Sequence, residues 1–69
     1  MRDWLVKIRT ESGKSQYAVA RQSGLSQSYY ALIETGDRGT KLPVETAKRI
    51  ADALGFSWQR FYDENSASK

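Results

Sequence analysis

Apolar residues recur along the chain at the three- and four-residue intervals that are typical of amphipathic helices. In residues 2–12, the residues that share one face are Trp4, Leu5 and Ile8. The clearest stripe follows Pro43, where the intervals are three, three, one and three: Val44, Ala47, Ile50, Ala51 and Leu54. No segment has the alternation of a half-buried strand. The pattern therefore predicts an all-α domain.

Turn-forming residues divide the chain into five short helices. Gly13 ends the first helix, and Ser15 is a suitable N-cap for a second helix over residues 16–23, with Val19 and Ala20 facing inward. Gly24 suits the left-handed position just after that helix. The next cap, Ser26, begins a third helix that extends from residue 27 to about residue 35, where Gly36 ends it.

The second half of the chain is predicted to contain a loop and two more helices. Residues 36–42 form an exposed loop, and Pro43 suits the first turn of a fourth helix that Gly55 ends. A short fifth helix is expected over residues 57–62, where Trp58 and Phe61 are more typical of core than of interface. We therefore expect one compact five-helix domain over residues 1–62 and a polar tail over residues 63–69.

The stretch SGLS joins two helices of about eight residues through a short turn containing glycine, which is the anatomy of a helix-turn-helix. The third helix carries adjacent tyrosines, Tyr29 and Tyr30. Neighbours on a helix point about 100° apart, so only one of the two can face the core. Periodicity alone leaves both choices open.

Composition excludes several classes of function. The 69 residues include no cysteine and no histidine, so thiolate zinc sites, cysteine nucleophiles and histidine bases are absent. No paired carboxylates, phosphate-binding glycine motif or metal-ligand cluster occurs, which argues against an enzyme and against a cofactor. No apolar run approaches the roughly 20 residues of a membrane span. The start MRDWLVKIRTE does not resemble a signal peptide, so we expect Met1 to be a natural start and the setting to be cytoplasmic.

The net charge of +3 is modest, but its distribution is informative. Residues 2–21 carry five cations against two acids, whereas residues 22–33 carry no charge at all. Two further cations, Arg38 and Lys41, follow. A neutral polar helix is thus bracketed by positive charge.

Residues 16–36, QYAVARQSGLSQSYYALIETG, resemble the helix-turn-helix core of the lambda-type repressor and Cro family, also called the xenobiotic-response-element family. The matching positions are Gln16, Val19, Ala20, Gly24, Leu25, Ser26, Tyr30, Ile33, Glu34 and Gly36. Residues 42–64 resemble the family's fourth and fifth helices, so the resemblance covers residues 5 to about 61. Lys14 departs from the pattern, because it replaces an apolar residue; we expect its stem to cover core while its amine reaches solvent.

The resemblance implies roles for individual residues. It places Tyr30 and Ile33 inside, so the base-contacting face consists of Gln27, Ser28 and Leu32. The residues expected to contact the DNA backbone are Gln16, Tyr29, Thr35, Arg38, Lys41 and Arg9. A structural ion pair is expected between Arg9 and Glu34. The simpler alternative for each polar residue is a solvated surface position.

The resemblance implies a sequence-specific regulator of transcription that binds double-stranded DNA, acts as a repressor by occupying its operator, and forms a homodimer on a palindromic site. It would be encoded by a bacterium, a phage or a mobile element, act in the cytoplasm at the nucleoid, and use no small-molecule ligand. Two alternatives stay open: the antitoxin of a toxin–antitoxin pair, and a protein-interaction module that has kept the fold without reading DNA.

Overall fold

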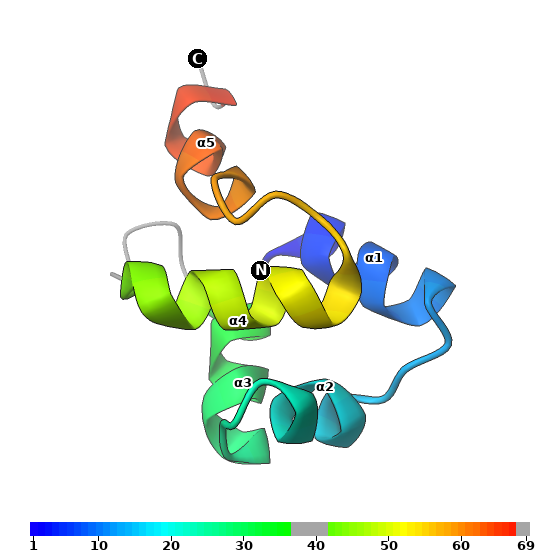
Figure 1. The fold of residues 1–69 in the computed structure, drawn as a ribbon. Helices are drawn as coiled ribbons and strands as arrows, with labels where there is room; N and C mark the ends of the chain where they lie inside the picture. Colours follow the sequence, from blue (N-terminus) through cyan, green and yellow to red (C-terminus); the bar gives the residue numbers. More distant parts are fainter. Residues whose placement is uncertain (37–41, 68–69) are drawn as a thin grey trace.

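The structure, a computed structural model, describes the backbone of residues 1–36 and 42–67 and the side chains of residues 1–36 and 42–63. These residues form five helices and no strand: α1 (Asp3–Glu11), α2 (Gln16–Gln22), α3 (Gln27–Thr35), α4 (Val44–Leu54) and α5 (Arg60–Ala67). Helix α4 crosses the middle of the molecule, with α2 and α3 on one side and α5 on the other (Figure 1). Helix α2 packs against both α3 and α4, and α1 packs against α3. The prediction of an all-α fold is confirmed.

Serine caps position the two helices of the helix-turn-helix. The Ser15 hydroxyl accepts a hydrogen bond from the Ala18 amide at 3.1 Å, and the Ser26 hydroxyl accepts one from the Tyr29 amide at 3.1 Å. Each cap satisfies a backbone donor that the first helical turn leaves unpaired. Between the helices, Gly24 has a φ of +72°, in the left-handed region that glycine adopts without strain. The turn is therefore built from the residue types that the sequence analysis identified.

The core is formed where the inward faces of the helices meet. Leu5, Val19, Tyr30, Ala47 and Ile50 are fully buried, at 0% exposure. Next to them, three aromatic rings pack edge-on or tilted at centroid distances of 5.2–5.7 Å: Trp4, Phe56 and Phe61. The core thus joins all five helices through one contiguous set of side chains.

Two predictions about the second half of the chain were wrong in detail. Val44 is 45% exposed, because it is the first residue of α4 and the apolar stripe extends there beyond the edge of the core. Leu42 was assigned to an exposed loop, yet it is only 8% exposed, and its carbonyl accepts a hydrogen bond from the Tyr62 hydroxyl at 2.6 Å. The residue therefore anchors the start of α4 to α5.

The fifth helix begins later and extends further than the sequence predicted. Residues 57–59 form a turn in which the Arg60 amide donates to the Ser57 carbonyl at 3.0 Å, and α5 starts at Arg60. The helix then continues to Ala67, through residues that were expected to belong to the tail. No glycine or proline follows Tyr62 to stop it.

Candidate nucleic-acid interface

Helix α3 presents one face to the core and the opposite face to solvent. Tyr30 and Ile33 point inward, with exposures of 0% and 3%. Tyr29 is 37% exposed and Leu32 is 60% exposed. Together with Gln27 and Ser28, which are also exposed, these residues form an uncharged outward face. The structure therefore orients α3 as the resemblance implied and resolves the choice between the two tyrosines.

A buried carboxylate holds α3 to the two preceding helices. Glu34 is 1% exposed, and its Oε2 atom accepts a hydrogen bond from Arg9 Nε at 2.5 Å. Its other oxygen, Oε1, accepts from Gln16 Nε2 at 2.8 Å and from Arg9 Nη2 at 3.5 Å. Arg9 comes from α1, Gln16 begins α2 and Glu34 lies near the end of α3. The expected Arg9–Glu34 pair is thus present, and Gln16 joins it.

Burial and nearby polar groups shift the pKa values of Glu34 and Tyr30 in this cluster. Burial alone would raise the pKa of Glu34, but the donors on Arg9 and Gln16 and the neighbouring Tyr30 hydroxyl outweigh it, so the pKa of Glu34 lies below its ordinary value. Burial, with a further contribution from the Glu34 carboxylate, raises the pKa of Tyr30 far above its ordinary value. The carboxylate is therefore charged and the phenol neutral at neutral pH.

Two residues that were expected to contact the DNA backbone are engaged within the protein. The Arg9 side chain is 14% exposed, and besides Glu34 it donates from Nη1 to the Lys14 carbonyl at 2.9 Å. The Thr35 hydroxyl donates to the Ala31 carbonyl of its own helix at 3.1 Å. Arg38 and Lys41 lie outside the residues that the structure describes. Tyr29, on the outward face of α3, is exposed, and Gln16, at the start of α2, is partly accessible.

Arg2 has a positioning role that the sequence analysis missed. It is only 3% exposed, and its Nη1 donates to the Ile33 carbonyl. Its backbone amide donates to the Glu34 carbonyl at 2.8 Å, and its guanidinium lies 5.6 Å from the centre of the Phe61 ring. A cation at the last carbonyls of a helix is favourable. No local pattern predicts this contact, because Arg2 and Ile33 are 31 residues apart.

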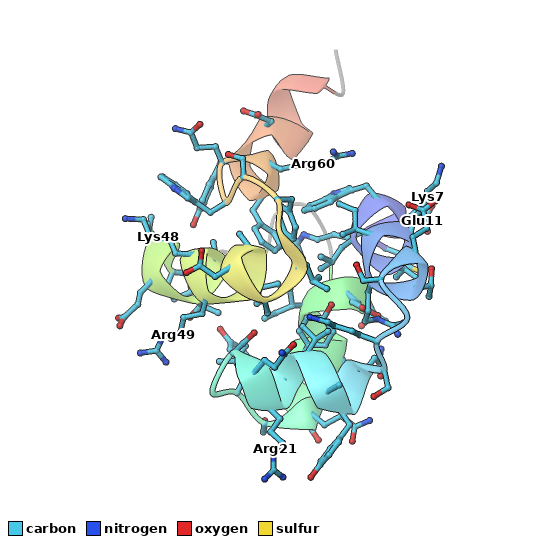
Figure 2. All side chains as sticks on the ribbon, turned by 45° about the vertical axis from the view of Figure 1, so that its right-hand side comes forward. Lys7, Glu11, Arg21, Lys48, Arg49 and Arg60 are labelled. Carbon is cyan, nitrogen blue, oxygen red and sulfur yellow. The ribbon has the colours of Figure 1, made fainter. Side chains whose placement is uncertain are left out.

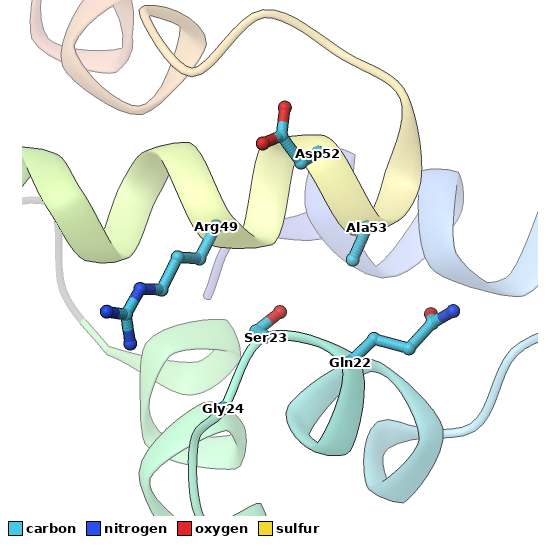
Figure 3. A pocket seen from close by; sticks show the side chains of 6 residues that line it. All are labelled: Gln22, Ser23, Gly24, Arg49, Asp52 and Ala53. Carbon is cyan, nitrogen blue, oxygen red and sulfur yellow. The ribbon is translucent and has the colours of Figure 1, made fainter.

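Lys14, which departs from the family pattern, connects α2 to α4. Its amine was expected to reach solvent, but it donates to the Gln22 side chain at 3.0 Å and to the Ala53 carbonyl at 2.7 Å. Beside this contact is an open pocket between α4 and the turn that follows α2, lined by Gln22, Ser23, Gly24, Arg49, Asp52 and Ala53 (Figure 3). Among the described residues, none of those expected to bind DNA lines this pocket.

Residues 5–61 of the chain match the model of a helix-turn-helix family. The chain belongs to this family. Its fold is of the lambda repressor-like, xenobiotic-response-element type, and the family comprises DNA-binding transcriptional regulators, not enzymes. The chain is 41% identical over 64 residues to the uncharacterized HTH-type transcriptional regulator YqaF of Bacillus subtilis (strain 168), in an alignment that covers 93% of this chain and 82% of that protein. No solved structure matches the chain.

Two further properties concern the described residues alone. None of their helices is long and apolar enough to cross a membrane. Within the same residues, no group of three or more histidine, cysteine, aspartate or glutamate side chains is placed to hold a metal ion.

Proposed function

We propose that this regulator reads a specific double-stranded DNA sequence with α3 and represses transcription by occupying its operator. The observation that carries the proposal is the outward face of α3, where Gln27, Ser28 and Leu32 are exposed and uncharged. In a helix-turn-helix, the first residues of the second helix contact base edges in the major groove. In its first turn this face carries the hydrogen-bonding side chains of Gln27 and Ser28, and one turn later the apolar side chain of Leu32.

Each of these side chains suits a particular contact with bases. The amide of Gln27 can donate to and accept from adenine N6 and N7 together, and the Ser28 hydroxyl can bond to several bases. Leu32 lies one turn further along α3 and suits contact with a thymine methyl group. The cluster around Glu34 supports this role, because a helix that reads bases must be held at a fixed angle to the rest of the domain.

Backbone contacts would come from residues around this face. The Gln16 amide retains one N–H after its bond to Glu34, and the Tyr29 hydroxyl is accessible. Thr35 would first have to release its bond to the Ala31 carbonyl, and Arg9 is held by Glu34, so both are weaker candidates than Gln16. Arg38 and Lys41, in the segment between α3 and α4, would add affinity without sequence information.

We further propose that two copies bind a palindromic operator, with half-sites about 10–10.5 base pairs apart. A domain of this size makes few base contacts, and a dimer doubles them. The contact between copies would use α5 and its flanks. Tyr62 is 39% exposed and Val44 45% exposed, and the Tyr62 ring packs against Trp58 at 5.9 Å. These residues supply apolar surface at α5 and at the start of α4. Helix α5 lies on the opposite side of α4 from α3 (Figure 1).

Selection of bound sequences from a random pool of duplex DNA tests the proposal. We expect a two-fold symmetric consensus whose half-sites are one helical turn apart. A consensus without symmetry would contradict the dimer, and a pool without enrichment would contradict sequence reading. The selected site would then be placed over a promoter in bacterial cytoplasm, the compartment in which we expect the protein to act. Reduced reporter expression supports repression, and increased expression contradicts it.

A further inference from the structure

A tyrosine and an arginine to which no role has been assigned above are joined on the outer side of α2. Tyr17 is 55% exposed, and Arg21, one turn further along the helix, is exposed as well. Arg21 Nη1 donates a hydrogen bond to the Tyr17 phenolic oxygen at 2.9 Å. The bond holds two long side chains in one arrangement on the surface of the domain.

The periodicity of α2 shows which flank this pair occupies. Val19 and Ala20 mark the buried stripe of the helix. Gln22 lies on the flank toward α4, because the Lys14 amine binds both its side chain and the Ala53 carbonyl. At 100° per residue, Tyr17 falls on the other side of the stripe, toward α3, whereas Arg21 lies almost opposite the stripe on the outer side of the helix. Both residues line an open pocket there with Lys14, Ala18 and Gln22. Arg21 accordingly projects from α2 away from α4 (Figure 2).

The charge on this flank is not compensated within the described residues. Among the described residues, the ion pairs join Arg9 to Glu34 and Arg49 to Glu45, and neither pair includes Arg21. Helix α2 itself contains no acidic residue, and the only acid of α3 is the buried Glu34. An anion approaching Arg21 along α3 therefore meets no opposing carboxylate on these two helices.

The hydrogen bond between the two side chains leaves the donors of both available to an anion. The Tyr17 oxygen accepts from Arg21, so its own proton is free to be donated. The guanidinium has five N–H donors and uses one of them in this bond. The pair thus presents a hydroxyl and several N–H groups beside one another, together with one positive charge. A phosphodiester, with one negative charge and two acceptor oxygens, matches that set.

We propose that the Tyr17–Arg21 pair binds a phosphate of the DNA backbone at the edge of the groove that α3 enters. This inference rests on the proposed function, and it adds a contact from α2 to those made by Gln16 and α3. The first helix of a helix-turn-helix crosses the DNA backbone, which places its outer flank near phosphates. The contact would raise affinity for all sequences and carry no base information.

Binding of the full chain to its selected operator and to a random duplex, measured over a range of salt concentrations, tests the inference. We expect Arg21→Ala to weaken binding to both duplexes alike and to lower the slope of log affinity against log salt by about one unit. Tyr17→Phe removes a neutral donor, so it should weaken both by about two- to tenfold and leave the slope unchanged. The control is Lys7→Ala, since Lys7 is an exposed cation on α1, far from Arg21 in the view of Figure 2. Its slope should equal that of the unmodified protein.

Several outcomes would count against the inference. Equal salt slopes for Arg21→Ala and Lys7→Ala, in variants with unchanged melting temperatures, would overturn it. So would normal DNA binding by Arg21→Ala combined with lost regulation in a reporter assay, which would assign the pair to a protein partner. If the unmodified chain binds neither duplex, the proposed function itself fails. If the unmodified chain binds its operator and Arg21→Ala binds equally well with the same salt slope, the Tyr17–Arg21 contact is rejected while the proposed function stands.

Discussion

Gln16 and Glu34 are 18 residues apart in the sequence, and a hydrogen bond of 2.8 Å joins their side chains. The same carboxylate binds Arg9, so one buried acid connects the start of α2, the end of α3 and the last turn of α1. Its position decides how α3 is held relative to α2. We therefore expect this cluster to determine both the stability of the domain and the orientation of the helix that reads DNA.

Removing the carboxylate should be strongly destabilising. Glu34→Ala would leave the Arg9 guanidinium, which is 14% exposed, without its partner and would also free Gln16. Breaking a buried pair costs about 3–5 kcal/mol, and the partial exposure of Arg9 favours the lower end. Chemical denaturation of the variant and of the unmodified protein measures this difference.

The matched control is a glutamate whose ion pair is exposed. Glu45 binds Arg49 at 2.9 Å within α4, with side chains that are 78% and 52% exposed. Surface pairs of this kind contribute about 0.3–0.5 kcal/mol, so Glu45→Ala should change stability little. Similar losses for Glu34→Ala and Glu45→Ala would show that the buried cluster has no special role.

Stability should depend on pH through Glu34. Its pKa in the folded protein lies below the ordinary value of 4.5, so the unfolded chain takes up a proton first as the pH falls. The stabilisation is therefore complete above about pH 4.5, declines below it and is lost as the pH passes through the folded pKa. Melting temperatures between pH 2 and 7 should fall less steeply for Glu34→Gln, which cannot titrate, than for the unmodified protein. Parallel curves would refute this assignment.

Much of the fold could be predicted because local signals and the core agree. Ser15 and Ser26 were recognised as caps from their side chains alone, since an N-cap is a local hydrogen bond. Leu42 could not be placed in the same way. A single leucine beside a polar loop has no periodicity, and its burial depends on α5, which comes later in the chain. Arg2 was missed for a similar reason, because its partners are the last carbonyls of α3.

The candidate site could be predicted only in part from the sequence. The orientation of α3 followed from a family pattern, because periodicity alone did not distinguish Tyr29 from Tyr30. The Tyr17–Arg21 pair carried a signal in its four-residue spacing, but that spacing is common on helices. Only the packing of α2 against α3 and α4 shows that the pair lies on the outer side of α2, with Tyr17 toward α3.

The two tyrosines of α3 should differ sharply when each is truncated. Tyr30→Ala would empty part of the core, where Tyr30 is fully buried, and should cost about 3–5 kcal/mol. Tyr29 is 37% exposed, so Tyr29→Ala should leave the fold nearly as stable while weakening DNA binding. Thermal melting without DNA measures the first effect. If Tyr29→Ala melted the domain and Tyr30→Ala did not, the orientation of α3 would be wrong by one position.

Gln27 should determine specificity more than affinity. Because its amide is expected to bond to a base edge, Gln27→Ala should cost about 1–3 kcal/mol on the preferred operator and much less on random DNA. The salt dependence should stay the same, since no charge is removed. Gln22→Ala is the control, because Gln22 is an exposed glutamine on the flank of α2 toward α4, where it bonds to Lys14, and is not on the outward face of α3; it should bind both duplexes normally. Equal losses on operator and random DNA would instead make Gln27 a backbone contact, and the reading of bases would then rest on Ser28 and Leu32.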